Sequence, residues 1–258
     1  MTEKKILIKD LEANYKISGK GQPILVLHGW GGSSDSWAKV QKILADKGFS
    51  VIVPDFPGFG KSKCPKEAWG ISNYVQWLKD LIKIVKIEEP FSLLGHSFGG
   101  RVAIKFSVKY PEKIKALILC SSAGIKPEKN LKTKTLYYIG KIGNYLFSKK
   151  PLRKFKDSAR NTFYRVIQQR DYLKVKGTMK ETIKKVLTED LFGYLSQIKV
   201  KTLIIWGEND LMVPIKYGYI MEQEIPNSKI IALPKIGHSP HLEIPEKFAK
   251  EILQFIES

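Results

Sequence analysis

The sequence predicts an α/β protein: a mostly parallel sheet of eight strands with helices on both faces and a helical cap inserted into it. Two observations carry this prediction. Short apolar segments alternate with segments of helical periodicity along most of the chain, a pattern typical of parallel strands joined by crossover helices. The alternation then stops between residues 124 and 195, over a stretch too long for a structureless loop.

The strands are predicted from short runs of apolar and β-branched residues. An antiparallel hairpin opens the chain at residues 5–8 and 14–17, and the other strands cover residues 24–27, 51–53, 93–94, 116–119, 202–206 and 229–233. Helices are expected over residues 36–47, from Ser72 to residue 85, from Gly100 onward and over 245–256. Ser72 is the expected N-cap of its helix, because a serine hydroxyl accepts hydrogen bonds from free backbone N–H groups.

The cap is predicted over residues 124–195, which divides the core into residues 1–123 and 196–258. Residues 124–190 hold 18 basic and 6 acidic side chains, so this segment carries most of the net charge of +19. It is also rich in tyrosine and phenylalanine. Most of these rings are expected to hold the cap helices together, and the others would line an apolar pocket.

The excess of positive charge comes from lysine, since only five of the 44 basic residues are arginine. Bidentate recognition of phosphates and bases favours arginine, so no specific nucleic-acid partner is expected. A lysine-coated surface is the simpler interpretation. Contact of the basic cap with a membrane surface stays open, because apolar side chains alternate with lysines over residues 131–150.

The composition indicates a soluble protein of the cytoplasm. No run is long and apolar enough to cross a membrane, and the first residues lack the apolar segment of a signal peptide. The two cysteines, Cys64 and Cys120, form no spacing pattern, so reduced thiols are expected.

The most informative motif is Gly95-His96-Ser97-Phe98-Gly99, set between an apolar strand and a helix. A serine in this setting is typical of a nucleophile elbow, a sharp turn that exposes the hydroxyl at the edge of the sheet. The flanking glycines remove β-carbons that would collide with the neighbouring strand and helix. Ser97 is therefore the predicted nucleophile.

A nucleophilic serine needs a general base. The chain has four histidines, His28, His96, His238 and His241. His238 follows the last strand, where a loop can reach over the sheet edge, and Gly237 favours a tight turn that presents it. We expect His238 to be the base, His241 to pack toward the last helix, and the other two to be structural.

The base needs an orienting acid, and the loop after residues 202–206 offers Glu208 and Asp210. The spacing does not decide between them. Asp55 follows the predicted strand 51–53 and is expected at the same sheet edge, but its proline- and glycine-rich surroundings indicate a role in loop structure.

Two backbone N–H groups are expected to form an oxyanion hole. One belongs to Phe98, directly after the nucleophile. The other is assigned to Trp30 in the loop His28-Gly29-Trp30-Gly31-Gly32, whose glycines permit close approach to a substrate. This loop lacks the spacing of nucleotide-binding motifs, and no cofactor or metal is expected.

Five motifs along the chain together resemble the α/β-hydrolase fold superfamily. They lie at residues 28–32, 54–62, 95–99, 207–214 and 237–238. The order Ser97, Asp210, His238 is also the order of that superfamily, and the resemblance assigns the acid to Asp210 rather than Glu208. It further implies a cap after the sixth strand.

The resemblance implies a serine esterase or lipase-like enzyme. The aromatic side chains of the predicted cap favour a small ester with an apolar or aromatic acyl group as its substrate. Ser97 at the elbow differs from the aspartate of dehalogenases and epoxide hydrolases. Carbon–carbon bond hydrolases of the meta-cleavage type remain an alternative, although they tend to carry asparagine or glycine where this chain has His96. A ligand receptor of low turnover on the same fold is the second alternative, because such proteins keep all three residues.

Overall fold

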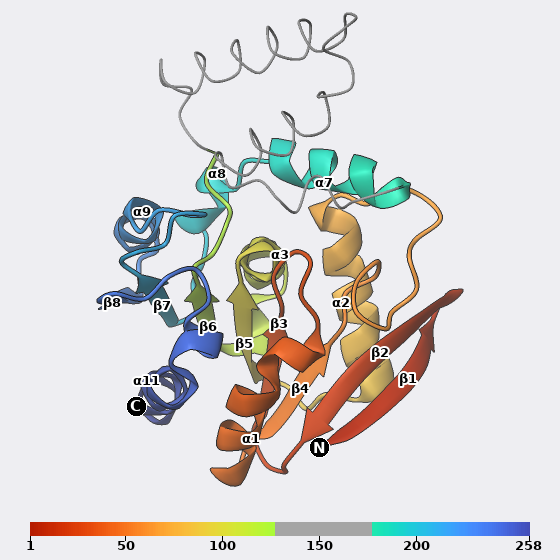
Figure 1. Ribbon diagram of the computed structural model, residues 1–258, viewed down its shortest axis with the longest axis horizontal. Coiled ribbons are helices and arrows are strands. Elements are labelled where there is room, and N and C mark those ends of the chain that lie inside the picture. Colours follow the sequence, from red (N-terminus) through yellow and green to blue (C-terminus); the bar gives the residue numbers. More distant parts are fainter. Residues whose placement is uncertain (127–176) are drawn as a thin grey trace, which may run out of the picture.

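The computed structural model describes residues 1–126 and 177–258. Its centre is an eight-stranded sheet in the order β1-β2-β4-β3-β5-β6-β7-β8 (Figure 1). The strands are β1 (Thr2–Ile8), β2 (Leu11–Ser18), β3 (Pro23–Leu27), β4 (Ser50–Pro54), β5 (Phe91–His96), β6 (Ile114–Cys120), β7 (Thr202–Gly207) and β8 (Ser228–Leu233). β1 and β2 run antiparallel to each other, as do β2 and β4, while the other neighbouring pairs of this sheet are parallel. The predicted mostly parallel architecture is confirmed.

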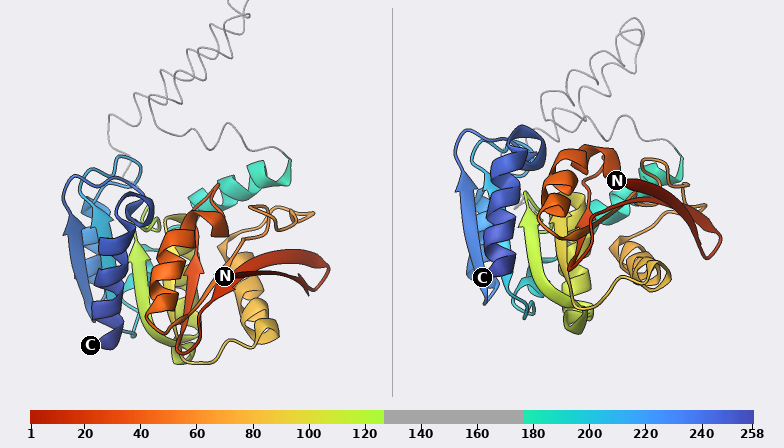
Figure 2. Two further views of the ribbon diagram at one scale, coloured as in Figure 1. Left: turned by 60° about the horizontal axis from the view of Figure 1, so that its bottom comes forward. Right: turned by 90° about the horizontal axis from the view of Figure 1, so that it is seen from below.

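Helices lie on both faces of the sheet (Figure 2). The longer ones outside the predicted cap are α1 (Ala38–Asp46), α2 (Ile71–Val85), α3 (Phe98–Lys109), α9 (Lys216–Glu224) and α11 (Pro245–Glu257), and the short ones are η1 (Ser34–Trp37), η2 (Pro111–Lys113) and α10 (Pro240–Glu243). α1 and α11 share a core cluster with Leu94 of β5, whereas α2 and α3 share a second cluster with Leu93. Successive residues of a strand point to opposite faces, so a central strand covered on both sides must be apolar at every position.

The predicted start of α2 is wrong by two positions. The helix begins at Ile71 with Gly70 as its N-cap, so Ser72 lies inside the first turn. The Gly70 N–H donates to Asn73 Oδ1 at 2.9 Å. The side chain that serves this helix start is therefore an asparagine three residues after the N-cap, and no serine hydroxyl is needed there.

Two helices of the predicted cap are described, α7 (Thr178–Thr188) and α8 (Phe192–Leu195), and both follow β6 as expected. Residues 127–176 lie outside the described part, and with them most of the cap predicted over 124–195, most of its tyrosine and phenylalanine side chains and the segment 131–150. The division into core and cap therefore stays a prediction. α7 contacts the core where Met179 lies against Gly58, in the loop after β4.

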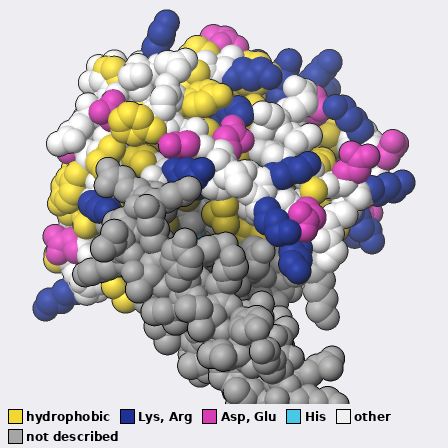
Figure 3. Space-filling model, turned by 90° about the horizontal axis from the view of Figure 1, so that it is seen from above, with side chains coloured by type: hydrophobic (Ala, Val, Ile, Leu, Met, Phe, Trp, Pro, Cys, Tyr) yellow, Lys and Arg dark blue, Asp and Glu magenta, His cyan; other side chains and the backbone are white. Residues whose placement is uncertain are grey.

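Lysine and arginine side chains are spread over the face of the molecule seen from above (Figure 3). Of the two cysteines, Cys64 is exposed and Cys120 is buried, and both are free thiols. Among the described helices, none has the length and apolar character required to cross a membrane.

Candidate active site

Ser97 occupies the turn between β5 and α3 in a backbone conformation that side chains rarely adopt. Its φ is 51° and its ψ is −110°, and α3 begins at the next residue, Phe98, two residues before the predicted start. Two hydrogen bonds tie the turn to the end of β6: Ser97 N–H donates to Cys120 O at 3.1 Å, and Ala123 N–H donates to Ser97 O at 3.0 Å. The surroundings therefore hold Ser97 in a strained geometry, as is common at functional sites.

The glycines on either side of Ser97 are required by contact with neighbouring backbone. A β-carbon on Gly95 would lie 2.6 Å from Gly99 O. A β-carbon on Gly99 would lie 2.8 Å from His28 O and closer still to the carbonyl of Leu27. The elbow thus packs directly onto the end of β3, as the sequence pattern predicts.

His238 and Asp210 come together directly, with 2.8 Å between His238 Nδ1 and Asp210 Oδ2. Asp210 is buried, and its other oxygen accepts hydrogen bonds from the N–H groups of Met212 and Val213, both at 2.9 Å. A carboxylate oxygen accepts only, so His238 Nδ1 carries a proton, and the lone pair of the neutral imidazole is then on Nε2. Glu208, the other acid considered from the sequence, is exposed to solvent.

The loop that carries His238 is held by a residue that the sequence analysis missed. Glu243, in α10, accepts hydrogen bonds from the N–H groups of Gly237 at 2.9 Å and Ser239 at 3.2 Å. Its carboxylate therefore binds the backbone N–H groups on both sides of His238. The sequence shows only an acid five residues after the histidine. Its hydrogen bonds could not be predicted, because they require the chain between the two residues to turn back on itself.

His96 contacts the same loop from the side of the nucleophile. Its Nε2 lies 2.9 Å from His238 O, and its ring centroid lies 4.9 Å from that of His238. Burial, together with the neighbouring imidazoles of His241 and His238, lowers the pKa of His96 well below the ordinary value. His96 is therefore a neutral structural imidazole, as predicted.

Ser97 and His238 are brought to the same edge of the sheet without a direct bond. Within residues 1–126 and 177–258, Ser97 Oγ makes no hydrogen bond. Hydrogen bonds between catalytic residues are often long before substrate binds. The ring of His96, the residue before Ser97, already contacts the His238 loop.

The glycine-rich loop after β3 lies against Ser97. A β-carbon on Gly29 would be 3.4 Å from Ser97 Cβ. Trp30 and Phe98 adjoin each other, with ring centroids 5.3 Å apart. In the described part of the chain neither residue uses its backbone N–H in a hydrogen bond, so both donors are available beside Ser97.

Asp55 and His28 have structural roles, in agreement with the sequence interpretation. Asp55 is buried and accepts three hydrogen bonds, from Asn14 Nδ2 at 2.9 Å, Ser34 N–H at 2.6 Å and Lys61 N–H at 2.9 Å. His28 Nε2 accepts from Phe56 N–H at 3.0 Å. Both side chains therefore fix loops near the site.

One group of potential metal ligands occurs among the described residues. Donor atoms of His96, Cys120 and His241 lie within 4.8 Å of one another, and all three residues are buried. His96 Nε2 already bonds His238 O, and burial raises the pKa of the Cys120 thiol well above its ordinary value. In this metal-free arrangement the three side chains are therefore uncharged, and one of their donor atoms is already used in a hydrogen bond.

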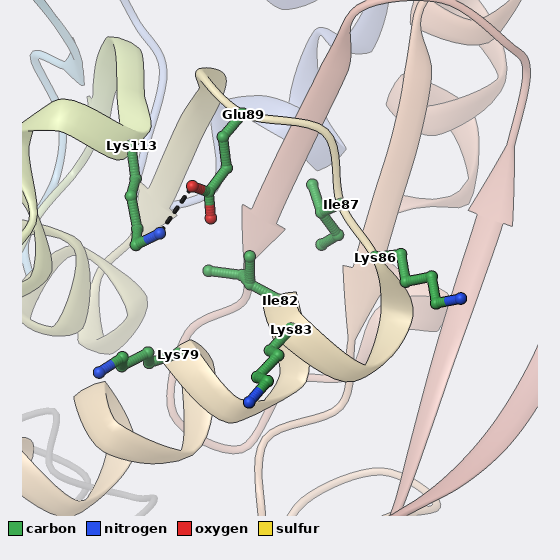
Figure 4. A pocket seen from close by; sticks show the side chains of 7 residues that line it. All are labelled: Lys79, Ile82, Lys83, Lys86, Ile87, Glu89 and Lys113. Carbon is green, nitrogen blue, oxygen red and sulfur yellow. Dashed lines mark hydrogen bonds and ion pairs between the residues drawn. The ribbon is translucent and has the colours of Figure 1, made fainter.

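A cavity of about 270 Å³ lies at the end of α2 (Figure 4). Four lysines line it around two isoleucines and an ion pair between Lys113 and Glu89. Glu89 precedes β5 and Lys113 precedes β6, so the cavity opens at the amino ends of the strands, whereas Ser97 lies at their carboxyl ends. It takes no part in the candidate site.

Comparison with known proteins agrees with this fold. The alpha/beta hydrolase fold family matches residues 22–138 and 125–245. The chain is 33% identical to a pimeloyl-[acyl-carrier protein] methyl ester esterase of Wigglesworthia glossinidia brevipalpis, over 94% of this chain and 96% of that protein. It is 29% identical to a 2-hydroxy-6-oxo-6-(2'-aminophenyl)hexa-2,4-dienoic acid hydrolase of Metapseudomonas resinovorans, over 95% and 88%.

A solved structure shares the fold. An esterase from Exiguobacterium antarcticum superposes with a TM-score of 0.78 at 22% identity, covering 98% of this chain and 99% of the other. The family match spans most of the chain, and the mostly parallel eight-stranded sheet agrees with that fold. The chain therefore belongs to the alpha/beta hydrolase fold family and is a hydrolase of that family.

Proposed function

We propose that the chain hydrolyses carboxylic esters through an acyl-enzyme, with Ser97 as nucleophile, His238 as general base and Asp210 as the acid that orients it. The observation that carries the proposal is the 2.8 Å contact between His238 Nδ1 and Asp210 Oδ2. It fixes the imidazole in the tautomer whose Nε2 can accept a proton from a serine hydroxyl.

The proposed reaction has two halves. Ser97 Oγ attacks the ester carbonyl while His238 Nε2 takes its proton, and the collapse of the tetrahedral intermediate returns that proton to the leaving alcohol. Water, activated by the same imidazole, then releases the acid from Ser97. The N–H groups of Trp30 and Phe98 would hold the oxyanion in both halves, each contributing about 3 kcal/mol. Asp210 stabilises the imidazolium, and no step uses a metal or cofactor.

A small ester with an apolar or aromatic acyl group is the proposed substrate class. Its support is the cluster of rings beside the two proposed oxyanion donors. Trp30 meets Phe59 and Phe98 edge to face, with centroids 4.8 and 5.3 Å apart, and Trp30 is partly exposed. Such a surface favours the burial of apolar groups.

A second candidate is hydrolysis of a carbon–carbon bond, as in meta-cleavage product hydrolases. The relative from Metapseudomonas resinovorans, named as a dienoic acid hydrolase, supports it at 29% identity. Ester hydrolysis is the preferred hypothesis, because the relative named as a methyl ester esterase is 33% identical over nearly the whole of both chains. The position before the serine, His96, also differs from the asparagine or glycine expected in the carbon–carbon hydrolases.

The test is a series of p-nitrophenyl esters, from acetate to palmitate, given to the wild type and to Ser97→Ala. We expect ester turnover in the wild type and a loss on the order of a millionfold in the variant. Turnover of a meta-cleavage product without ester turnover would transfer the proposal to the second candidate. Equal ester turnover in the wild type and Ser97→Ala would contradict the role of Ser97 as nucleophile. Tight ligand binding without turnover would favour the low-turnover receptor.

A further inference from the structure

We infer that His96 is a positioning residue, which holds the general base over the nucleophile by a hydrogen bond from its side chain to the backbone carbonyl of His238. The inference rests on the proposed function of the Ser97 site. It assigns a role to the residue directly before the nucleophile, which the proposed reaction itself does not use.

The direction of this hydrogen bond follows from its acceptor. His96 Nε2 lies 2.9 Å from His238 O, and a carbonyl oxygen can only accept. His96 therefore carries its proton on Nε2. Its other ring nitrogen faces the loop after β3, because a β-carbon on Gly29 would lie 2.8 Å from His96 Nδ1.

His96 thus contacts three segments that the proposed reaction needs. It is bonded covalently to Ser97, its ring edge lies on Gly29 of the proposed oxyanion loop, and its Nε2 reaches the loop of His238. The side chain is only 6% exposed, so little room remains for it to move. One ring therefore fixes the relative placement of the nucleophile, the loop before Trp30 and the base.

The other contacts of the His238 loop point elsewhere. Asp210 connects the imidazole to the end of β7, and Glu243 connects the neighbouring amides to α10. Ser97 lies at the end of β5, which β6 and β7 separate from β8. Among the hydrogen bonds of the described residues, the one from His96 joins the His238 loop to the strand that carries the nucleophile.

The His96 ring also packs against other rings. His241 lies edge-on to it with centroids 4.6 Å apart, and Trp37 stacks on His241 at 4.1 Å and 6°. This packing and the burial of His96 restrict rotation of the ring, whose Nε2–H donates to His238 O. Because the proton transfer from Ser97 requires placement of the base within a few tenths of an ångström, loss of this contact acts on the rate of reaction rather than on binding.

The experiment measures reaction of Ser97 with a fluorophosphonate, a probe that needs no knowledge of the natural substrate. The Ser97 oxygen forms a bond to phosphorus, fluoride leaves, and His238 accepts the serine proton. Three variants are compared with the wild type: His96→Leu, which removes the donor; His96→Gln, whose amide can still donate; and Gln41→Leu. The last is a matched control, because it removes a buried side-chain donor to the Val51 carbonyl, 3.0 Å away at the amino end of β4.

We expect His96→Leu to lower the maximal labelling rate between about 10- and 100-fold with the reversible affinity for the probe unchanged. His96→Gln should recover most of that rate, and Gln41→Leu should label like the wild type at a comparable loss of thermal stability. Wild-type labelling by His96→Leu, or a His96→Gln variant as slow as the leucine variant, overturns the inference. Failure of the wild type to label, or equal labelling of Ser97→Ala, instead overturns the proposed function before any His96 variant is considered.

A second measurement does not depend on variants that fold. ¹⁵N NMR of the histidine side chains in the wild type reports which ring nitrogen is protonated. We expect His96 to be neutral with its proton on Nε2 and protected from exchange. A proton on Nδ1, or a ring in rapid exchange between both forms, contradicts the hydrogen bond to His238 O.

Discussion

The carboxylate of Asp210 and the imidazole of His238 meet at 2.8 Å although 28 residues separate them in the chain. Each follows one of two neighbouring parallel strands, β7 and β8, whose register pairs Gly207 with Leu233. Parallel strands in register end at the same edge of the sheet, so the loops that leave them face each other. The fold therefore brings the acid to the base without any local sequence motif that contains both.

We expect Asp210→Asn to lower kcat for ester hydrolysis about 10⁴-fold, because an amide donates to the imidazole and favours the wrong tautomer. Asp210 is buried and accepts hydrogen bonds from two backbone N–H groups, which an asparagine oxygen can still accept, so the fold is retained. Steady-state kinetics on a p-nitrophenyl ester, with circular dichroism to confirm folding, measures the effect.

The control for that variant is Glu208→Gln. This acid is two residues earlier in the same loop and is exposed, so its neutralisation should leave kcat within about twofold of the wild type. A large loss at Glu208 together with a small one at Asp210 would reverse the assignment.

The strained backbone of Ser97 predicts that Ser97→Gly stabilises the protein while abolishing hydrolysis. A φ of 51° with a ψ of −110° is unfavourable for a residue with a side chain, and relief of such strain is worth about 1–3 kcal/mol. Glycine adds flexibility to the unfolded chain, which offsets up to about 1 kcal/mol, so we expect a net gain of about 1 kcal/mol.

Urea denaturation of Ser97→Gly and Ser97→Ala separates strain from the loss of the hydroxyl. Alanine keeps the β-carbon, so the free energy of unfolding of Ser97→Ala should stay near that of the wild type. If the two variants were equally stable, the turn would hold no strain of the kind its dihedral angles indicate.

The parts of the fold that the sequence predicts well are those fixed by local pattern. Each of the eight strands appears within a few residues of its expected range, because short apolar runs between turns leave few other structures. The elbow around Ser97 is also local: a strand, a turn that needs glycine at 95 and 99, and a helix. The contacts that could not be predicted join residues far apart in the sequence, because the local sequence pattern does not show which residues lie close together across the sheet.

Three residues illustrate that limit. Ser72 matches a helix cap by type, but the helix begins earlier: Gly70 is the N-cap, and the Asn73 side chain accepts a hydrogen bond from its N–H. The spacing after β7 allows Glu208 as well as Asp210, and only the resemblance decided between them. The hydrogen bonds of Glu243 depend on the turn that α10 makes back toward Gly237, which no periodicity encodes.

The close contact of the elbow with β3 predicts a steric effect at Gly99. In Gly99→Ala the added methyl group would meet His28 O at 2.8 Å and the carbonyl of Leu27 more closely, and backbone atoms of a central strand have little freedom to move. We expect the free energy of unfolding to fall by about 3 kcal/mol.

The matched substitution is Gly193→Ala in α8. A β-carbon there meets nothing within 4 Å, and alanine is the better helix former, so this variant should be neutral or more stable by up to about 1 kcal/mol. Chemical denaturation of both proteins measures the difference. Equal effects at the two positions would mean that the elbow does not press on β3.

The buried His241 predicts that the protein loses stability in mild acid. Burial, and to a smaller degree the neighbouring His238, lowers the pKa of His241 to about 3. In the unfolded chain a histidine titrates near its ordinary value of about 6.5. Between these two values the unfolded state binds more protons than the folded state, so the folded state becomes less stable as the pH falls through this range.

Between pH 7 and pH 5 the contribution of this one group amounts to about 2 kcal/mol of lost stability. His241→Phe removes the titrating group and keeps a ring to stack on Trp37, so its stability should fall less over the same interval. Urea denaturation of both proteins at pH 7 and pH 5 gives the comparison. His241→Phe should still lose some stability between pH 7 and pH 5, because burial also lowers the pKa of His96. An identical acid dependence in the two proteins would mean that His241 takes up protons as readily in the folded state as in the unfolded one.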